Sequence, residues 1–160
     1  MVMIEDIAHA LSMQCRFAGH CRYFYSVAEH SCLVSSLLPS DLALKGLLHD
    51  AAEAYVTDIP TPLKNQLFSF KKIEDKISLV IFEAFGLELD QDEYNDIKFA
   101  DAQALKIEAN ILVNTPHIDN WTDRLPDCQN TELGLWGPSM AKAVFLDKFY
   151  SLMNLKEKAA

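Results

Sequence analysis

The chain has 160 residues, half of them hydrophobic, and a formal net charge of −9 at pH 7. A chain of this length and composition is expected to fold as one globular domain over residues 1–160. The acidic balance argues against a general binder of nucleic acid or of membrane surfaces, because such proteins carry excess positive charge.

Two features bear on where the protein works. No apolar run reaches the length needed to span a bilayer, and residues 1–6 carry acid where a signal peptide carries base. The four cysteines form no CxxC pair; they are Cys15, Cys21, Cys32 and Cys128. We therefore expect free thiols, acting mainly as small hydrophobic residues, in a cytoplasmic protein kept reduced.

The first third of the chain has apolar residues at helical spacing. A first helix is predicted from positions i, i+3, i+4 and i+7, which are Ile4, Ile7, Ala8 and Leu11. A polar and aromatic connector follows over residues 14–25. Ser26 and Glu29 have the spacing of a capping box, so a second helix should begin there and end near Pro39.

A third helix is expected to begin at Ser40 or Asp41 and to contain the adjacent pair His49–Asp50. Two prolines in three residues, Pro60 and Pro62, should end it. Leucines and alanines surround the pair, so burying these ionisable groups costs free energy unless something neutralises them.

The next part of the chain is also predicted to be helical. A fourth helix over residues 70–85 should stop at Gly86. A capping box at Asp90 and Glu93 should begin a fifth helix, which runs through Leu112.

Residues 114–137 contain several turn-formers together with Trp121 and Trp136, so we expect an irregular lid or interface there. Pro138 can open a last helix. The sequence has no internal repeat and no convincing strand pattern. It therefore predicts an all-α fold, a single bundle of about six helices.

Three of these helices carry residues suited to a metal ion. His49 and Asp50 leave their helix about 100° apart and can converge on one ion. His30 lies on the second helix, and Asp101 lies on the apolar face of the fifth, where a carboxylate needs a partner. Together the four would form a nitrogen and oxygen site suited to Mn, Fe, Co, Ni, Zn or Mg. Taken singly, each has an alternative: a His that is only hydrogen-bonded, or an Asp paired with Arg.

At these residues the sequence resembles the HD superfamily of metal-dependent phosphohydrolases. The pattern H…HD…D is met in order, with spacings of nineteen and fifty-one residues. Residues 25–31 resemble the "VAEHS" signature of nucleotide-directed members. Residues 47–64 are similar to the "HDxxE…DxPTPxK" run of bacterial 5′-deoxynucleotidases and of short phage-type proteins that include deoxynucleoside triphosphohydrolases. The resemblance covers roughly residues 4–112.

The resemblance implies an HD-domain bundle with the metal between helices, held by His30, His49, Asp50 and Asp101. It also implies catalytic roles for two acids. Glu53, four residues after His49, would be the base or acid that handles the proton of water, and Asp58 would help it or orient substrate. The alternative for Glu53 is a surface charge on an exposed helix edge.

The phosphate groups of a substrate need cations. The family resemblance favours Arg16 and Lys64 for this role, with Phe17 stacking on a base or sugar and Lys98 as a second phosphate ligand. The alternatives are an Arg paired with an acid, an aromatic in the core and a solvated lysine.

The resemblance implies a phosphohydrolase acting on (deoxy)nucleotides, either a dNTP triphosphohydrolase or a 5′-nucleotidase. Two alternatives stay open: a cyclic-nucleotide or alarmone phosphohydrolase, and a non-catalytic nucleotide-binding regulatory module. We expect a divalent metal cofactor, a small-molecule nucleotide substrate, no nucleic-acid polymer or membrane partner, and a homo-oligomer of at least two subunits.

Overall fold

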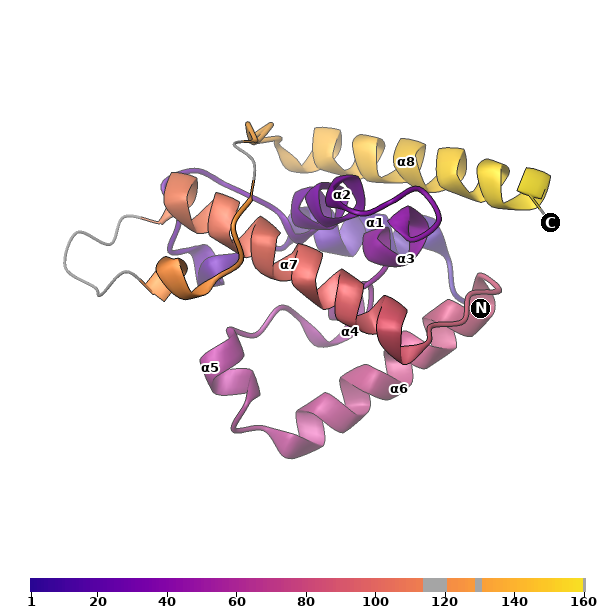
Figure 1. Cartoon of the computed structure of the whole chain (residues 1–160), viewed down its shortest axis with the longest axis horizontal. Helices are drawn as coiled ribbons and strands as arrows, with labels where there is room; N and C mark the ends of the chain where they lie inside the picture. Colours follow the sequence, from indigo (N-terminus) through magenta and orange to yellow (C-terminus); the bar gives the residue numbers. More distant parts are fainter. Residues whose placement is uncertain (114–120, 129–130, 160) are drawn as a thin grey trace.

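A computed structural model describes residues 1–113, 121–128 and 131–159, and in these ranges it is all-helical (Figure 1). The only strand-like pairing within them is an isolated antiparallel bridge between Cys15 and Ser26. The helices are α1 (Ile4–Met13), η1 (Phe17–Gly19), α2 (Val27–Leu37), α3 (Ala43–Leu47), α4 (Glu53–Val56), α5 (Thr61–Lys64), α6 (Phe68–Ala84), α7 (Gln91–Leu112), η2 (Trp121–Arg124) and α8 (Pro138–Ala159), where η denotes a short 3-10 helix.

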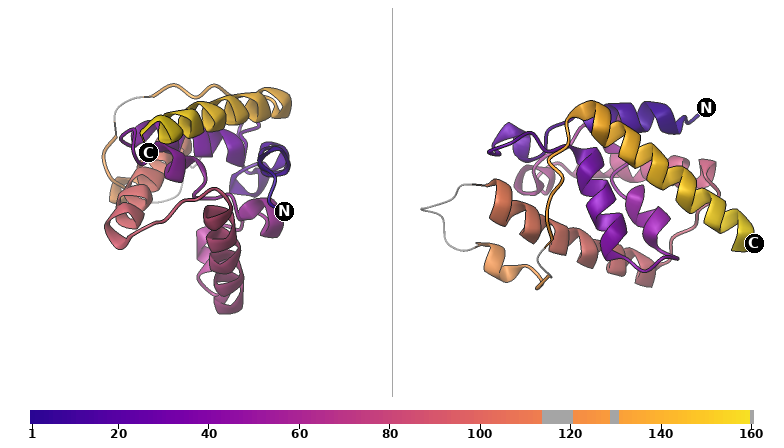
Figure 2. Two further views of the ribbon diagram at one scale, coloured as in Figure 1. Left: turned by 90° about the vertical axis from the view of Figure 1, so that its right-hand side faces the viewer. Right: turned by 90° about the horizontal axis from the view of Figure 1, so that it is seen from above.

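Helix α2 is the centre of the arrangement. It packs against α1, α3, α7 and α8, and α8 lies across one side of this group (Figures 1 and 2). Every residue of α2 from Val27 to Ser35 is buried, including the ring of His30. A helix covered on all sides places whatever polar groups it carries in the interior, where they need partners.

Helix α6 differs from the others because most of it projects from the body of the protein (Figure 2, left). Only Ile81 and Phe82, near its end, are buried, whereas Ile73, Leu79 and Val80 are at least half exposed. Helix α6 ends where predicted, with Gly86 in the left-handed region at φ +61°.

The expected third helix is interrupted at the residues of greatest interest. His49 and Asp50 lie in a tight turn between α3 and α4, not inside a helix. Hydrogen bonds between residues three apart replace the helical ones, because the N–H of Ala51 donates to Leu48 O and that of Glu53 to Asp50 O. This break and the short helix α5 (Thr61–Lys64) raise the number of α-helices in the described residues above the expected six.

The predicted helix starts are confirmed in three places and wrong in one. The side chain of Ser26 caps the start of α2. At Asp90 both hydrogen bonds of the capping box are formed, so the box caps the start of α7. Pro138 is the first residue of α8. Helix α3 instead begins after Leu42, and no side chain of Ser40 or Asp41 caps it, because the chain enters α3 through a turn in which Leu42 N–H donates to Pro39 O.

The capping box at Ser26 is only half formed. Its Glu29 side chain does not return to the cap; it accepts the N–H groups of Leu135 and Trp136 at 2.7 and 2.8 Å. Glu29 thereby attaches Leu135 and Trp136, in the segment that leads into α8, to the start of α2. Of the predicted irregular segment, residues 121–124 form η2, and residues 114–120 and 129–130 lie outside the described part.

None of the described helices is both long enough and apolar enough to cross a membrane.

The cap at Ser26 fixes the first turn of the helix that carries His30. Replacing Ser26 with Ala should lower the free energy of unfolding by about 1 kcal/mol, since one buried N–H loses its acceptor. Chemical denaturation measures this. Ser40→Ala is the matched control, because exposed Ser40 caps nothing, and it should change stability by less than about 0.5 kcal/mol. Equal effects of the two substitutions would contradict the assignment.

Candidate metal centre

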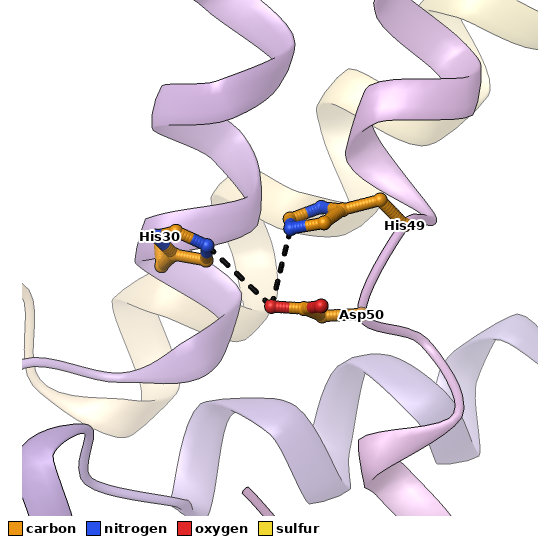
Figure 3. A group of neighbouring side chains, drawn as sticks. All are labelled: His30, His49 and Asp50. Atoms are coloured by element: carbon orange, nitrogen blue, oxygen red, sulfur yellow. Dashed lines mark ion pairs between the residues drawn. The ribbon is translucent and has the colours of Figure 1, made fainter. Parts of the chain in front are cut away.

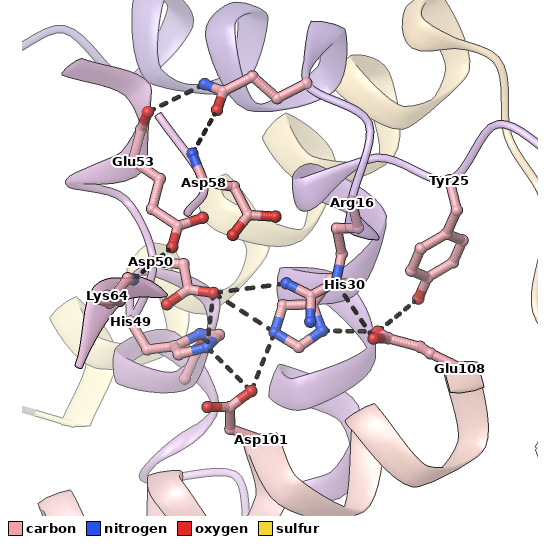
Figure 4. A network of polar contacts seen from close by, with 12 residues as sticks. Arg16, Tyr25, His30, His49, Asp50, Glu53, Asp58, Lys64, Asp101 and Glu108 are labelled. Carbon is pink, nitrogen blue, oxygen red and sulfur yellow. Dashed lines mark hydrogen bonds and ion pairs between the residues drawn. The ribbon is translucent and has the colours of Figure 1, made fainter. Parts of the chain in front are cut away.

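The four predicted metal ligands converge from three parts of the fold. His30 comes from α2, His49 and Asp50 from the turn after α3, and Asp101 from α7 (Figures 3 and 4). One ligand atom each of His30, His49 and Asp50 lies within 4.8 Å of the others. Asp101 approaches the two rings from the side opposite Asp50, as Figure 4 shows.

The distances between the nitrogens and oxygens define a small polar space. Asp50 Oδ2 lies 3.5 Å from His30 Nε2 and 3.2 Å from His49 Nε2. Asp101 Oδ1 lies 3.2 Å from His30 Nε2 and 3.8 Å from His49 Nε2. Two imidazoles and two carboxylates therefore surround one point, and three of the four side chains are more than four-fifths buried.

Both histidines direct one ring nitrogen, Nε2, into this space. The other nitrogen of each ring is engaged: His30 Nδ1 lies 2.6 Å from Glu108 Oε1, and His49 Nδ1 lies 2.8 Å from Gly46 O. A carbonyl requires Nδ1–H as donor, so in the neutral ring Nε2 of His49 is an acceptor that faces carboxylate oxygens, and a proton or a cation on Nε2 removes this conflict. Within the described residues both buried Nε2 atoms lack a hydrogen-bond partner. This donor set, with the outer nitrogens oriented by hydrogen bonds, fits a divalent cation.

The charges of the cluster lead to the same conclusion. Burial lowers the pKa of His49, but Asp50 and Asp101 outweigh it and raise that pKa to about 9. Burial raises the pKa of Asp101, but the two histidines outweigh it and hold that pKa well below its usual value. The four residues thus favour added positive charge, which a metal ion supplies.

Glu108 organises the side of the centre away from the metal ligands. This fully buried carboxylate accepts hydrogen bonds from Tyr25 Oη at 3.1 Å and Arg16 Nε at 3.2 Å, in addition to its contact with His30 (Figure 4). Burial raises its pKa, but Arg16 and His30 outweigh this and keep the pKa below its usual value. Glu108 therefore orients one candidate metal ligand, His30, and one cation, Arg16, at once.

Arg16 is brought to the centre as predicted, although its pairing also matches the alternative. Its guanidinium is bound to Glu108 and lies 3.9 Å from Asp50 Oδ2 through Nη1. The adjacent Phe17 is half-buried, and its ring centroid lies 5.7 Å from Arg16 Cζ. Arg16 is thus both a structural ion-pair partner and a cation beside the metal ligands.

Glu53 is buried, contrary to the alternative of an exposed helix edge, at 3% exposure. Its Oε1 accepts from Lys64 Nζ at 3.1 Å, and its Oε2 has no hydrogen-bond partner in the described residues. Burial, with the charges of Asp50 and Asp58, raises the pKa of Glu53 to about 8. Lys64 does not reverse this, because Glu74 holds the same ammonium more closely, at 2.8 Å.

Asp58 lies just beyond α4, and burial raises its pKa. Gln14 holds this exit from the helix. Its side-chain amide donates to Glu53 O at 3.0 Å, and its oxygen accepts from Asp58 N–H at 3.0 Å and Thr57 Oγ1 at 3.3 Å. Thr57 has φ +70°, a conformation that a β-branched residue rarely adopts. Through its bonds to Glu53 O and Asp58 N–H, Gln14 fixes the backbone of Asp58 relative to that of Glu53.

Lys98 is the least enclosed of the predicted residues. Its ammonium contacts Asp101 Oδ2 at 3.2 Å, and its side chain is 47% exposed. It lies on the lining of a groove of about 620 Å³ that begins at His49 and Asp50 and that Lys64 also lines. The groove runs between α6 and the start of α7.

Sequence reasoning missed Glu108, Tyr25 and Gln14. Glu108 had a usable signal, because it lies seven residues after Asp101 on the same face of one helix. Tyr25 and Gln14 lie in or next to an irregular connector, where spacing does not reveal which side chains turn inward.

Comparison with known proteins finds relatives of this chain in bacteria. The chain is 38% identical over 159 residues to the uncharacterized protein YfdR of Escherichia coli K12, covering 99% of this chain and 88% of YfdR. The chain belongs to the YfdR family. The whole centre, from Gln14 to Glu108, lies within that relationship.

A second relative gives a shorter match. The uncharacterized protein RCAP_rcc00048 of Rhodobacter capsulatus is 35% identical over 120 residues, which cover 68% of this chain and 61% of that protein. No family model matches the chain.

The role of Glu108 is testable apart from any activity. Glu108→Gln keeps the shape but weakens the acceptor of His30, and it should lower the affinity for Mn²⁺ or Co²⁺ by about 10–100-fold. Competition with a chromophoric chelator measures this. Glu157→Gln, on the exposed end of α8, is the control and should leave the affinity unchanged. Unchanged affinity in Glu108→Gln would contradict the assignment.

The raised pKa of Glu53 predicts a pH dependence of stability in the metal-free protein. The folded state keeps a proton that the unfolded state loses above about pH 4.5. The contribution of Glu53 to stability is therefore complete at low pH and is lost as the pH rises toward 8, by at most about 1.4 kcal/mol per pH unit. Denaturation of wild type and Glu53→Gln from pH 5 to 8 should show wild type falling relative to the variant. Parallel curves would contradict the prediction.

Proposed function

We propose that the chain is a metal-dependent phosphohydrolase of the HD superfamily that acts on (deoxy)nucleotides. The observation that carries the proposal is the pair of buried His Nε2 atoms, which face two carboxylates and have no hydrogen-bond partner in the part of the chain that the structure describes. The order and spacing of the four residues match the H…HD…D pattern on which the resemblance depends. In this proposal α2, the turn after α3 and α7 are the metal-binding part of an HD domain.

The metal would be held by His30, His49, Asp50 and Asp101. A divalent ion bound there supplies a Lewis acid for a phosphoryl oxygen and lowers the pKa of a bound water. All other parts of the proposed reaction belong to the chain's own side chains.

Glu53 is the proposed site of proton transfer. Among the described residues its Oε2 has no hydrogen-bond partner, while Lys64 fixes the other oxygen, so a proton on Oε2 has a defined position. A pKa near neutrality suits a group that both gives and accepts a proton during turnover. Asp58, held by Gln14, orients the water or the substrate beside it.

The cations divide between two sides of the centre. Arg16 lies on the Asp50 side and offers terminal N–H groups to phosphate oxygens, with Phe17 beside it for the nucleoside. Lys64, Lys71 and Lys98 line the groove beside five acids, which are Asp50, Glu74, Asp75, Glu83 and Glu88, so an anionic substrate would enter it together with a divalent cation. Cations along a groove favour a substrate with several phosphates, so a dNTP triphosphohydrolase is the first choice and a 5′-nucleotidase the second.

The alternatives differ in what they require. A cyclic-nucleotide or alarmone phosphohydrolase would use the same metal ligands on another ester. A regulatory module that only binds a nucleotide has no need for a buried acid with a free oxygen, and Glu53 therefore favours an enzyme.

A substrate panel tests the proposal. Purified protein with Mn²⁺ or Co²⁺ should hydrolyse at least one of a set of dNMPs, dNTPs, cyclic nucleotides and alarmones. Release of phosphate, pyrophosphate or triphosphate identifies the bond that breaks. Absence of turnover with every metal would refute the proposed phosphohydrolase activity and leave the regulatory nucleotide-binding module as the remaining alternative.

Two substitutions separate metal binding from proton transfer. Asp50→Ala should remove bound metal and activity together, because it deletes a ligand. Glu53→Gln should keep the metal and lower kcat by about 10²–10⁴-fold, because the proton carrier is lost. Metal content and steady-state kinetics measure both. Asp96→Ala replaces an exposed acid on α7 and, as the control, should change neither metal content nor kcat. If Asp50→Ala loses activity but retains the metal, Asp50 is not a metal ligand.

A further inference from the structure

Two cysteines meet at the loop that carries Arg16. Cys15 Sγ lies 3.4 Å from Cys21 Sγ, and Cys21 Sγ also lies 3.8 Å from Arg16 O. Both cysteines are free and half-buried. The residues between them include Arg16, which contacts Asp50 of the candidate metal centre, and Phe17, whose ring lies beside the Arg16 guanidinium.

The backbone holds these two sulfurs together. Cys15 is bridged to Ser26, and Arg16 N–H donates to Tyr25 O at 2.9 Å, so one end of the loop is fixed. Phe17, Ala18 and Gly19 all have positive φ, at 55°, 50° and 79°. Three left-handed residues in succession reverse the chain sharply and return it to its own start. The contact between the sulfurs is therefore a consequence of the loop conformation.

The geometry and exposure suit a bond between the two sulfurs. A disulfide needs a separation of about 2.05 Å, which these sulfurs reach by a shift of roughly 1.4 Å. Half-buried side chains also admit a small oxidant, whereas Cys32 on α2 is only 5% exposed.

We propose that Cys15 and Cys21 form a redox-active pair whose reversible disulfide closes the loop around Arg16 and Phe17. The oxidant is a low-molecular-weight disulfide such as oxidised glutathione. The Cys15 thiolate attacks one of its sulfurs, forms a mixed disulfide and expels one glutathione thiolate. Cys21 then gives up its proton, its sulfur attacks Cys15 Sγ, and the second glutathione leaves. Two electrons pass to the oxidant, and two protons pass to the two glutathione thiolates.

The order of these steps follows from the environment of Cys21. Burial, followed by the contact with Cys15, raises the pKa of the Cys21 thiol to about 11. Cys21 is therefore a poor first nucleophile and serves as the resolving thiol. Bonds of this kind in a reducing compartment are transient and reversible.

The effect of the bond is local and independent of catalysis. Oxidation would restrain the seven residues from Cys15 to Cys21, including the amides of Gly19 and His20, which donate to Arg16 O and Phe17 O. Any effect on nucleotide binding rests on the proposed role of Arg16, but the bond itself does not.

Purified protein equilibrated with a series of reduced-to-oxidised glutathione ratios tests the proposal. Alkylation followed by peptide mass spectrometry should find a Cys15–Cys21 linkage that dithiothreitol reverses, with Cys32 and Cys128 alkylated. Hydrogen exchange at Gly19 and His20 should slow at least tenfold on oxidation. The midpoint of thermal unfolding should rise by roughly 5 °C, as expected for closing a short loop.

The variants provide matched controls. Cys15→Ser and Cys21→Ser should each abolish the linkage and the change in exchange, whereas Cys128→Ser should retain both. A stable glutathione adduct on one cysteine, a linkage between two chains, or four cysteines alkylated at every ratio would each overturn the proposal. These readouts need no substrate, so they stand whether or not nucleotide hydrolysis is found.

Discussion

The carboxylate of Glu108 is the interaction on which the rest of the centre depends. It is fully buried on α7, yet it is charged, because three donors from two other segments reach it: Tyr25, Arg16 and His30. Without it, buried Arg16 would keep only the longer ion pair with Asp50, at 3.9 Å, and His30 would lose the bond that orients its ring. One acid thus joins the connector before α2, α2 itself and α7 into a single polar unit.

The centre as a whole holds more acid than base. Against the cations Arg16, Lys64 and Lys98, the described residues bring together six carboxyl groups, which are Asp50, Glu53, Asp58, Glu74, Asp101 and Glu108. The imbalance raises the pKa values of the histidines and of Glu53, so the protein retains protons that free side chains would lose. Such an excess of acid favours cations electrostatically, and it disfavours any anionic ligand that a cation does not accompany.

The helices and the convergence of the four candidate ligands were predictable from the sequence because each leaves a periodic or spaced signal. Apolar spacing located α1, α6 and α7, and Asp101 was found because a carboxylate stood on an apolar face. The turn at His49–Asp50 was not predictable, since its Leu and Ala residues are good helix formers and only the tertiary arrangement breaks the helix. The contacts of Gln14 and the second use of Glu29 also depend on chain segments brought together by folding.

The contacts of Glu29 join distant parts of the chain, so we expect them to form late in folding. Its bonds to the N–H groups of Leu135 and Trp136 join residues 106 and 107 positions apart, and the bond of Arg16 to Glu108 spans 92. Closing loops of this length is slow, because the chain loses entropy before any contact forms to compensate. The neighbouring helices α1, α2 and α3 can associate early, but the polar centre is complete only after α7, which carries Asp101 and Glu108, has docked. Its assembly is therefore a marker of the last stage of folding.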